Sequence, residues 1–557
     1  MLIPSGPADS KLMIVLDCVS NRDLYSNTIL NDREFDRMLT AAGGNRSRAF
    51  VTALIREQVY GQSFEANVAR NQTEAKQPGW ANLHNRAVRP CIVEGHTSLF
   101  KDIDLVKPRI ILAIGNGALF ALTGKWGMKS WRGSSLELTT PEGHTCYVIP
   151  TYSPDYIQAV WKDRNIVIHD LRRALEWSRL STPPRAPDYE FIIEPDFPTV
   201  TSTLRKLLSL VEAGPLKLSV DIETRGGHIA CTGIAWSKIS AICIPHIRAV
   251  VAETPNWQAR INYWREEEEA YILHLLYQLL THPNTEVIGQ NFLYDAQYFY
   301  RHFHFIPRFK RDTMIAQHCL FSSMQKSLDF LSSMYTDFHV YWKDESKNWD
   351  PKLGERQLWI YNCKDCCVTY EVDEQEQAAI DAMLPSWPKL REVHDFQQAL
   401  FYPVLNTMIR GLRTDNTSKA ALSSELLEAI QTREAWLTEV LGFPLNIKSP
   451  KQMQDVFYRL LGQQKIFKRG TGSPTTDDAA LERIATREPL LAPVCDCIRE
   501  LRSLNVFRST FLEAPIDIDA RMRCSFNIAG TETYRFSSSE NAFGSGMNLQ
   551  NLPKGDD

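Results

Sequence analysis

The sequence contains no apolar run of the length that a membrane-spanning helix needs. Its first residues, Met-Leu-Ile-Pro-Ser-Gly-Pro, lack both the basic start and the apolar stretch of a secretion signal. It also lacks an excess of one charge, since 62 Lys and Arg residues face 66 Asp and Glu residues and leave a net charge of −4. The composition therefore argues against a membrane-spanning helix, and the near-neutral charge argues neither for nor against a nucleic-acid partner. The absences predict a cytoplasmic protein with no membrane partner.

The 12 cysteines follow no disulfide framework. Cys363, Cys366 and Cys367 form one group and Cys495 and Cys497 another, but no second pair completes a zinc-binding spacing. We therefore expect reduced, buried thiols. With 44% hydrophobic and 23% charged residues, the 557-residue chain has an ordinary globular composition and room for three or four domains.

Changes in local composition divide the chain. Residues 177–189 are rich in proline and polar residues and predict a linker, and a softer boundary lies near 380–390. The expected domains are therefore 1–176, 190–380 and 385–557. In the first domain, strands at 13–16, 110–114 and 147–149 and a helix at 118–123 predict an α/β layer fold. In the third, long helical patterns such as 418–440 predict a mainly helical, projecting arm.

Three short polar motifs follow one another in the second domain. Asp221 and Glu223 lie two positions apart in an apolar, β-branched stretch that predicts a strand, so both should point to one face. Asn291 and Asp295, and then Tyr361 and Asp365, lie four positions apart in stretches with helical spacing, which places each pair on one helix face. Each motif alone is common at solvated strand ends and helix faces.

The three motifs together favour catalysis. One strand and two helices are expected to present their polar pairs to a common centre. Two divalent ions about 4 Å apart need such a carboxylate cage to clamp the attacking and leaving oxygens of a phosphodiester. Magnesium and manganese prefer these hard oxygen ligands.

Residues 190–380 resemble the DEDD-type 3′–5′ exonucleases in their tyrosine-containing form, an RNase H-like fold in which helices flank a mixed sheet. Residues 289–295 and 311–314 are especially similar to the proofreading domain of the bacterial DNA polymerase I family. The resemblance implies two Mg²⁺ ions, with Mn²⁺ as the alternative, held by Asp221, Glu223, Asp295 and Asp365. It also implies that Tyr361 orients the attacking water and that Asn291 supports the site or contacts the substrate.

The first domain resembles the uracil-DNA glycosylase superfamily in residues 106–115, 132–133 and 149–156. It departs from that family in two places. Residues 16–23 replace the usual Gly-Glu-Ala-Pro-Gly-type loop, and Ser153 stands where a histidine usually precedes the proline. These departures favour a retained fold that binds DNA or packs against the exonuclease over an active glycosylase. Uracil release that is lost on changing Asp17 or Asp23 would reverse this preference.

The third domain resembles the family A DNA polymerases in residues 530–538 and 548–553. Tyr534 stands where that family usually has glycine. The resemblance implies contact with a primer-template duplex, in which Arg535 donates to the minor groove or a primer phosphate. The amides of the 548–551 segment add contacts, and Thr531, with Ser537, holds the turn. The expected nucleic-acid-binding residues are Thr531, Arg535, Asn548, Gln550 and Asn551.

The leading interpretation is the N-terminal part of a bacterial or phage-like family A DNA polymerase that removes nucleotides from DNA 3′ ends. Its expected partners are primer-template DNA and single-stranded DNA 3′ ends. The family's catalytic aspartates and fingers lysine lie beyond the motif at 530–553, so we expect polymerisation to need a further C-terminal part. This part would belong either to a longer form of the chain or to a separate C-terminal half. The alternatives are a stand-alone DEDD exonuclease that acts on RNA or DNA, and a non-catalytic DNA-binding scaffold.

Overall fold

The computed structural model describes residues 1–58, 61, 63–249, 260–344, 354–468, 470 and 472–552. The chain divides into two compact units, Met1–Gln398 and Ala399–Asp557. Both helices and strands are present throughout, and the predicted α/β multidomain fold class is confirmed. All 12 cysteines are free, and all but Cys18 and Cys91 are buried.

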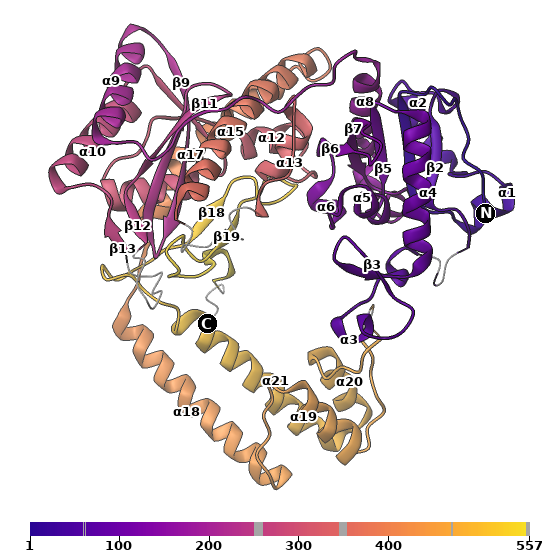
Figure 1. Ribbon diagram of the computed structural model, residues 1–557. Helices are drawn as coiled ribbons and strands as arrows, with labels where there is room; N and C mark the ends of the chain where they lie inside the picture. The colour runs from indigo at the N-terminus through magenta and orange to yellow at the C-terminus, as the bar shows by residue number, and fades with distance from the viewer. Residues whose placement is uncertain are drawn as a thin grey trace. The chain divides into compact units, whose positions relative to one another are not determined.

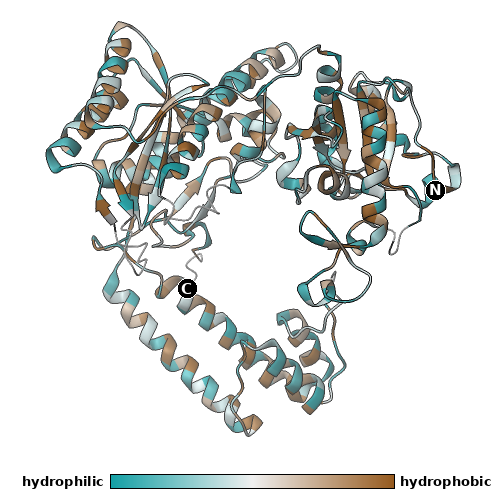
Figure 2. Ribbon diagram, viewed as in Figure 1, coloured by the Kyte–Doolittle hydropathy of each residue, from teal (hydrophilic) through white to brown (hydrophobic). Residues whose placement is uncertain are grey.

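The first unit begins with a five-stranded sheet in the order β2-β1-β5-β7-β6. Its strands are β1 (Leu12–Cys18), β2 (Phe50–Ile55), β5 (Ile110–Ile114), β6 (Leu136–Thr139) and β7 (Thr145–Thr151). All neighbours pair in parallel except β6 and β7. The strands are strongly hydrophobic (Figure 2), because helices cover them. Helix α4 (Pro90–Val106) contacts β2, and α8 (Arg164–Arg179) contacts β5 and β7 (Figure 1).

The strand expected at residues 110–114 is present and runs into a glycine turn. Strand β5 ends at Ile114, Gly115 turns the chain with a φ of 92°, and α5 (Asn116–Thr123) follows. A Cβ atom at position 115 would lie 2.3 Å from the Asp17 carboxylate, so the turn needs glycine for both its φ and its close approach. This turn brings the start of α5 against the end of β1.

The second sheet of this unit has six strands in the order β15-β14-β9-β10-β11-β8. They are β8 (Glu190–Ile192), β9 (Leu216–Arg225), β10 (His228–Ala235), β11 (Ser240–Pro245), β14 (Thr285–Gly289) and β15 (Phe309–Asp312). The sheet is mixed, since β9, β10 and β11 are antiparallel while β14 is parallel to β9 and β15. A mixed sheet with flanking helices is what the exonuclease resemblance implies.

Helices cover this sheet. Helices α9 (Phe197–Ala213) and α10 (Glu266–Thr281) pack on each other at one side, and α15 (Arg356–Met383) lies across β9, β10 and β11 (Figure 1). The close approach of α15 depends on Gly233 of β10, where a Cβ atom would lie 2.4 Å from Asn362 Oδ1. This packing places the α15 side chains directly over the central strand β9.

The second unit is mainly helical, as expected for the third domain. Helix α18 (Asn416–Leu441) extends the predicted 418–440 helix by a few residues, since the Asp415 carboxylate caps its first turn. It contacts α21 (Ala492–Phe507), which packs against α20 (Asp478–Arg487) around a core that includes Met453, Phe457 and Ile498. Strands β18 (Ser525–Asn527) and β19 (Ser537–Ser539) pair in antiparallel fashion near the end of the chain.

Within the described part of the chain, every helix is either too short or too polar to cross a lipid bilayer.

Candidate active site

Three of the four predicted acidic ligands meet above the second sheet. Asp221 and Glu223 point from one face of β9, and Asp365 points from α15, each offering an oxygen within 4.8 Å of the others. The strand and the second helix expected from the sequence are therefore both present. The two-residue spacing on β9 and the crossing of α15 over that strand bring the three carboxylates together.

Asp295 lies beside this group. It belongs to α11 (Leu293–Tyr298), is 4% exposed, and its Oδ1 accepts a hydrogen bond of 3.0 Å from the backbone N–H of Ile222. Ile222 lies between Asp221 and Glu223, so the fourth carboxylate is attached to the strand that holds the first two. Burial, and next the charge of Asp221, raises the pKa of Asp295 well above its usual range.

The placement of Asn291 on the same helix face as Asp295 is wrong. Helix α11 begins at Leu293, and Asn291 precedes it with an exposed side chain and a φ of 55°. The helix starts late because the Asp312 carboxylate draws in the backbone of this turn, accepting the N–H groups of Asn291 at 3.0 Å and Phe292 at 2.7 Å. The i, i+4 rule applies only inside a helix.

Asp312 is a residue of this site that the motif reasoning missed. It is 1% exposed and also accepts the N–H of Met314 at 2.8 Å at the start of α12 (Thr313–Leu320). Burial raises the pKa of its carboxyl to about 6, against the lowering effect of these backbone hydrogen bonds. An aspartate directly before a helix is a typical N-cap, and this signal could have identified it.

Tyr361 and Asp365 share one face of α15, as predicted. Tyr361 accepts a 2.9 Å hydrogen bond from Lys343 Nζ, and the same ammonium pairs with the Asp365 carboxylate. Asp365 Oδ1 accepts a 2.7 Å hydrogen bond from Trp342 Nε1. No spacing in the sequence points to residues 342 and 343, because they lie outside any regular element.

Asn362 is a further missed neighbour. Its Nδ2 donates to Asp221 Oδ2 at 2.8 Å, and its side chain is fully buried between α15 and β10. It follows Tyr361 directly, and a polar residue inside a helix of buried residues was the available signal. Asn362 thereby links α15 to the first carboxylate of β9.

The electrostatics of the site suit divalent cations. Burial, and next the charge of Asp365, raises the pKa of Asp221 to about 7, with Lys343 opposing the shift. Burial and the charges of Asp221 and Asp365 likewise raise the pKa of Glu223 well above its usual range. Buried carboxylates that repel one another gain most from a bound cation. An all-oxygen donor set suits a hard divalent ion, as a DEDD exonuclease domain implies.

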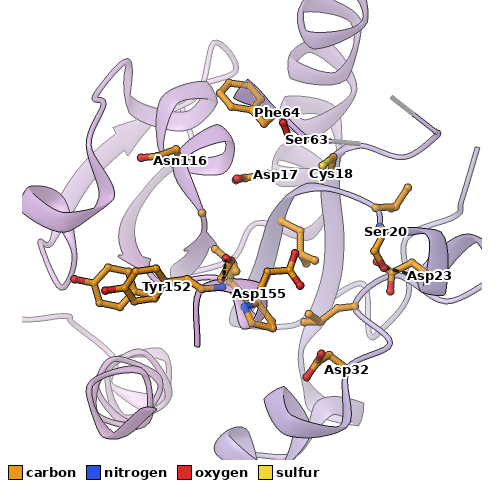
Figure 3. Close-up of a pocket in the computed structure, with 18 of the residues that line it drawn as sticks. Asp17, Cys18, Ser20, Asp23, Asp32, Ser63, Phe64, Asn116, Tyr152 and Asp155 are labelled. Atoms are coloured by element: carbon orange, nitrogen blue, oxygen red, sulfur yellow. Dashed lines mark hydrogen bonds between the residues drawn. The ribbon is translucent and has the colours of Figure 1, made fainter. Parts of the chain in front are cut away.

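A cavity of about 890 Å³ lies in the first domain (Figure 3). Asp17, at the end of β1, enters it near Asn116, and its Oδ1 accepts a 2.7 Å hydrogen bond from the N–H of Ala118. Burial raises the pKa of this carboxyl to about 7. Phe64 supplies an aromatic face to the same cavity.

The other residues discussed for this domain have structural partners. Asp23 accepts the N–H groups of Ser20 at 2.8 Å and Asn31 at 2.6 Å, so it holds a turn (Figure 3). Ser153 caps α7 (Pro154–Ala159) by accepting the N–H of Tyr156 at 3.2 Å. Asp17 likewise accepts the N–H of Ala118 in the first turn of α5, so each of these three side chains has a local structural partner.

The polymerase-like motif lies in the second unit. Thr531 Oγ1 accepts the N–H of Arg535 at 3.0 Å and donates to its carbonyl at 2.8 Å, which places Thr531 in the turn. Tyr534 has a φ of 61°, the left-handed conformation that glycine favours. Asn548 accepts the Gln550 N–H at 3.0 Å, and Gln550 Nε2 donates to the Phe536 carbonyl at 2.9 Å. The Arg535, Gln550 and Asn551 side chains are exposed.

Three successive segments match known families. Residues 22–174 match the uracil DNA glycosylase superfamily, residues 196–375 match a 3′-5′ exonuclease family, and residues 416–557 match DNA polymerase family A. The three resemblances predicted from the sequence are thereby confirmed. The chain contains a glycosylase-like domain, a 3′–5′ exonuclease domain and a family A polymerase segment.

Its relatives include bacterial DNA polymerases. The chain is 27% identical over 382 residues to DNA polymerase I of Synechocystis sp., which covers 64% of this chain and 36% of that polymerase. It is 32% identical over 148 residues to the thermostable DNA polymerase I of Thermus aquaticus, or 26% and 17% of the two chains. The chain thus spans only about a third or less of these relatives.

Among solved structures, one described as the POL domain of Pol1 from M. smegmatis in complex with DNA primer-template and dNTP is similar with a TM-score of 0.47. The match has 20% sequence identity and covers 66% of this chain and 56% of that one.

Proposed function

We propose that residues 190–380 form a two-metal 3′–5′ exonuclease that proofreads DNA 3′ ends for a family A DNA polymerase. The convergence of Asp221, Glu223 and Asp365, with Asp295 attached to the same strand, carries this proposal. These four carboxylates would hold the two ions, Mg²⁺ or Mn²⁺, that activate water and stabilise charge on the phosphate when bound.

Tyr361 would orient the attacking water in this proposal. Burial, and next the charge of Asp365, raises the pKa of its phenol, so the hydroxyl keeps its proton at neutral pH. A protonated phenol beside Asp365 can donate one hydrogen bond and accept another, which suits the placement of a water molecule. Asn291, exposed at the turn before α11, would contact the substrate.

The motif at 530–552 supports primer-template binding by the same protein. Arg535, Gln550 and Asn551 are exposed and would contact the duplex, while Thr531 and Asn548 hold the local backbone. Minor-groove acceptors occur on every base pair, so such donors sense pairing geometry without reading sequence. A duplex grip favours DNA proofreading over a stand-alone exonuclease that acts on RNA.

The test is digestion of end-labelled substrates with Mg²⁺. We expect 3′–5′ removal of nucleotides from single-stranded and mismatched DNA, faster than from matched duplexes. An Asp221→Ala, Glu223→Ala protein should be inactive, whereas Glu267→Ala, which changes an exposed acid of α10, should match the parent. Unchanged digestion by the double variant would refute the site, and equal digestion of RNA would favour the stand-alone exonuclease.

A second candidate function is hydrolysis of the bond between a flipped base and its sugar in the N-terminal cavity. The observation that favours it is Asp17, because a half-buried carboxyl in a cavity, with its pKa raised to about 7, can act as a general base at neutral pH. Release of free uracil from a uracil-containing single strand tests it. Asp17→Asn should abolish release and Asp9→Asn, an exposed change, should not; no release by the parent leaves the domain as a binding or packing module.

A further inference from the structure

A buried segment joins the N-terminal domain to the exonuclease site. It comprises residues 332–343, which we call the connecting segment, and begins in the last turns of α13 (Leu328–Tyr335). Beyond Tyr335 it has no regular secondary structure, yet His339 is 1% exposed and Trp342 is 2% exposed. An irregular segment is buried this deeply only when other parts of the protein satisfy its backbone.

Groups of the N-terminal domain form several of the hydrogen bonds to the backbone of the connecting segment. Ser135 N–H donates to the His339 carbonyl at 2.7 Å, and the Tyr341 N–H donates to Ser134 Oγ at 3.1 Å. Arg173 donates to the Thr336 carbonyl at 3.1 Å. These bonds hold the segment at three points along its backbone.

Side chains of the N-terminal domain reinforce this attachment. Arg132 bonds to Ser333 Oγ and also donates to Asp170 at 2.7 Å in a fully buried ion pair. Phe338 stacks on Trp177 with ring centroids 6.2 Å apart. A buried guanidinium with its carboxylate and a stacked ring leave the segment little freedom.

The far end of the connecting segment contacts the exonuclease carboxylates. Trp342 Nε1 donates a hydrogen bond of 2.7 Å to Asp365 Oδ1. The Lys343 ammonium pairs with Asp365 Oδ2 and donates to the Tyr361 hydroxyl at 2.9 Å. Both oxygens of Asp365 and the water-orienting phenol are therefore held by two consecutive residues. The hydrophobic cluster of the N-terminal sheet also continues through Trp342 to Tyr361.

We propose that the N-terminal domain positions Tyr361 and Asp365 through the connecting segment, with Trp342 and Lys343 as the positioning residues. This inference rests on the proposed exonuclease function. It gives the glycosylase-like domain a role in proofreading that requires no chemistry in its own cavity. The outer partners of metal ligands set ligand orientation, and their loss typically lowers metal affinity or activity by about 10- to 100-fold.

The test uses the full chain and three variants. Trp342→Phe keeps an aromatic ring but removes the donor to Asp365, and Lys343→Gln removes the ammonium. Ser134→Ala removes a hydroxyl in the N-terminal domain that reaches the segment at the Tyr341 N–H. The matched control is Ser178→Ala, which removes a buried hydroxyl bonded only within α8, to the Leu175 carbonyl at 2.8 Å.

We expect kcat for nucleotide release from single-stranded DNA to fall about tenfold or more in the residue 342 and 343 variants, with KM little changed. Ser134→Ala should lower kcat roughly three- to tenfold, the effect of one lost hydrogen bond. The dissociation constant for Mn²⁺, measured by electron paramagnetic resonance, should rise in Trp342→Phe and Ser134→Ala. A merely structural defect would reduce the active fraction and leave that constant unchanged. Lys343→Gln also removes a positive charge that repels a cation at this site, so its kcat alone tests the positioning role.

Two results separate the possible failures. Activity retained by Asp365→Ala would overturn the proposed function itself. In the second result, Asp365→Ala is inactive while Trp342→Phe, Lys343→Gln and Ser134→Ala all keep the parent kcat, and the first and last of these three also keep the parent Mn²⁺ affinity. In that case the exonuclease stands and the positioning role is wrong. Melting curves on each variant confirm that folded protein is compared, and Ser178→Ala should match the parent in every measurement.

Discussion

Replacing Asp17 with asparagine should stabilise the protein at high pH and leave it unchanged at low pH. The residue is half-buried at the end of β1, and the loss of solvent around its carboxyl raises the pKa from 3.8 to about 7. Asparagine has nearly the same shape and keeps an oxygen to accept the Ala118 N–H. The substitution therefore removes the ionisable group with little change in packing.

The raised pKa of Asp17 in the folded protein determines how folding stability changes with pH. Between pH 4 and pH 7 the folded protein keeps the Asp17 proton while the unfolded chain loses it, so folding stability falls as pH rises through this window. About three pKa units at 1.36 kcal/mol each give an upper limit of about 4 kcal/mol. Above pH 7 the penalty is constant. The Asp17→Asn variant has no ionisable group at this position and does not pay this penalty. Its gain in folding stability over the parent should therefore grow from near zero at pH 4 to its maximum above pH 7.

The assay is the melting temperature of parent and variant at several pH values. For a cooperative unit of this size, the full effect corresponds to roughly 5 °C. Other buried acids, such as Asp312, contribute to the pH dependence of both proteins, so the difference between the two curves isolates Asp17. A difference that is the same at pH 4.5 and pH 8, or a variant less stable at pH 8, would refute the reasoning. The exposed variant Asp9→Asn should show no difference at either pH.

Three further predictions concern packing and backbone. Asp312→Asn would turn an amide donor toward the Phe292 N–H, which donates to the present carboxylate at 2.7 Å, and should lower the free energy of unfolding by about 1–3 kcal/mol. Urea unfolding measures this change, and cleavage of single-stranded DNA is the functional readout. An unchanged urea midpoint would contradict a role of Asp312 in holding the turn at residues 291–292. Gly233→Ala would place a Cβ atom 2.4 Å from Asn362 Oδ1 and should cost about 1–3 kcal/mol and reduce exonuclease activity, while Gly214→Ala, where nothing lies within 4 Å, serves as its control. Tyr534→Gly should relieve a left-handed strain of about 1–2 kcal/mol, partly offset by the greater chain entropy of glycine, and a lower melting temperature would show that the ring contributes more than the backbone costs.

Local periodicity was enough to predict the elements that carry the site. The strand with Asp221 and Glu223 and the helix with Tyr361 and Asp365 follow from two-residue and four-residue spacings within single elements. The prediction that Asn291 lies in a helix was wrong because the Asp312 carboxylate at the end of β15 sets the backbone conformation of Asn291. Local patterns carry no information about such a partner.

The hydrogen-bond partners of Asp365 could not be predicted from the sequence, because they too depend on contacts between residues distant in the chain. Trp342 and Lys343 lie in an irregular segment whose path depends on hydrogen bonds to Ser134 and Ser135, some two hundred residues earlier. Their side chains have no period and no motif of their own. Only the folded chain shows that they contact Asp365.

The shared hydrophobic cluster links stability in one domain to activity in the other. It includes Met13 and Leu112 of the N-terminal sheet together with Leu331 and Tyr361 of the exonuclease. Neighbouring elements that share one core tend to unfold as one cooperative unit. Asp17→Asn should therefore also slow thermal inactivation of the exonuclease at pH 8, although Asp17 lies in a separate cavity. If inactivation of the exonuclease is unaffected while the melting temperature rises, the two domains unfold independently and the N-terminal domain cannot act through a common core.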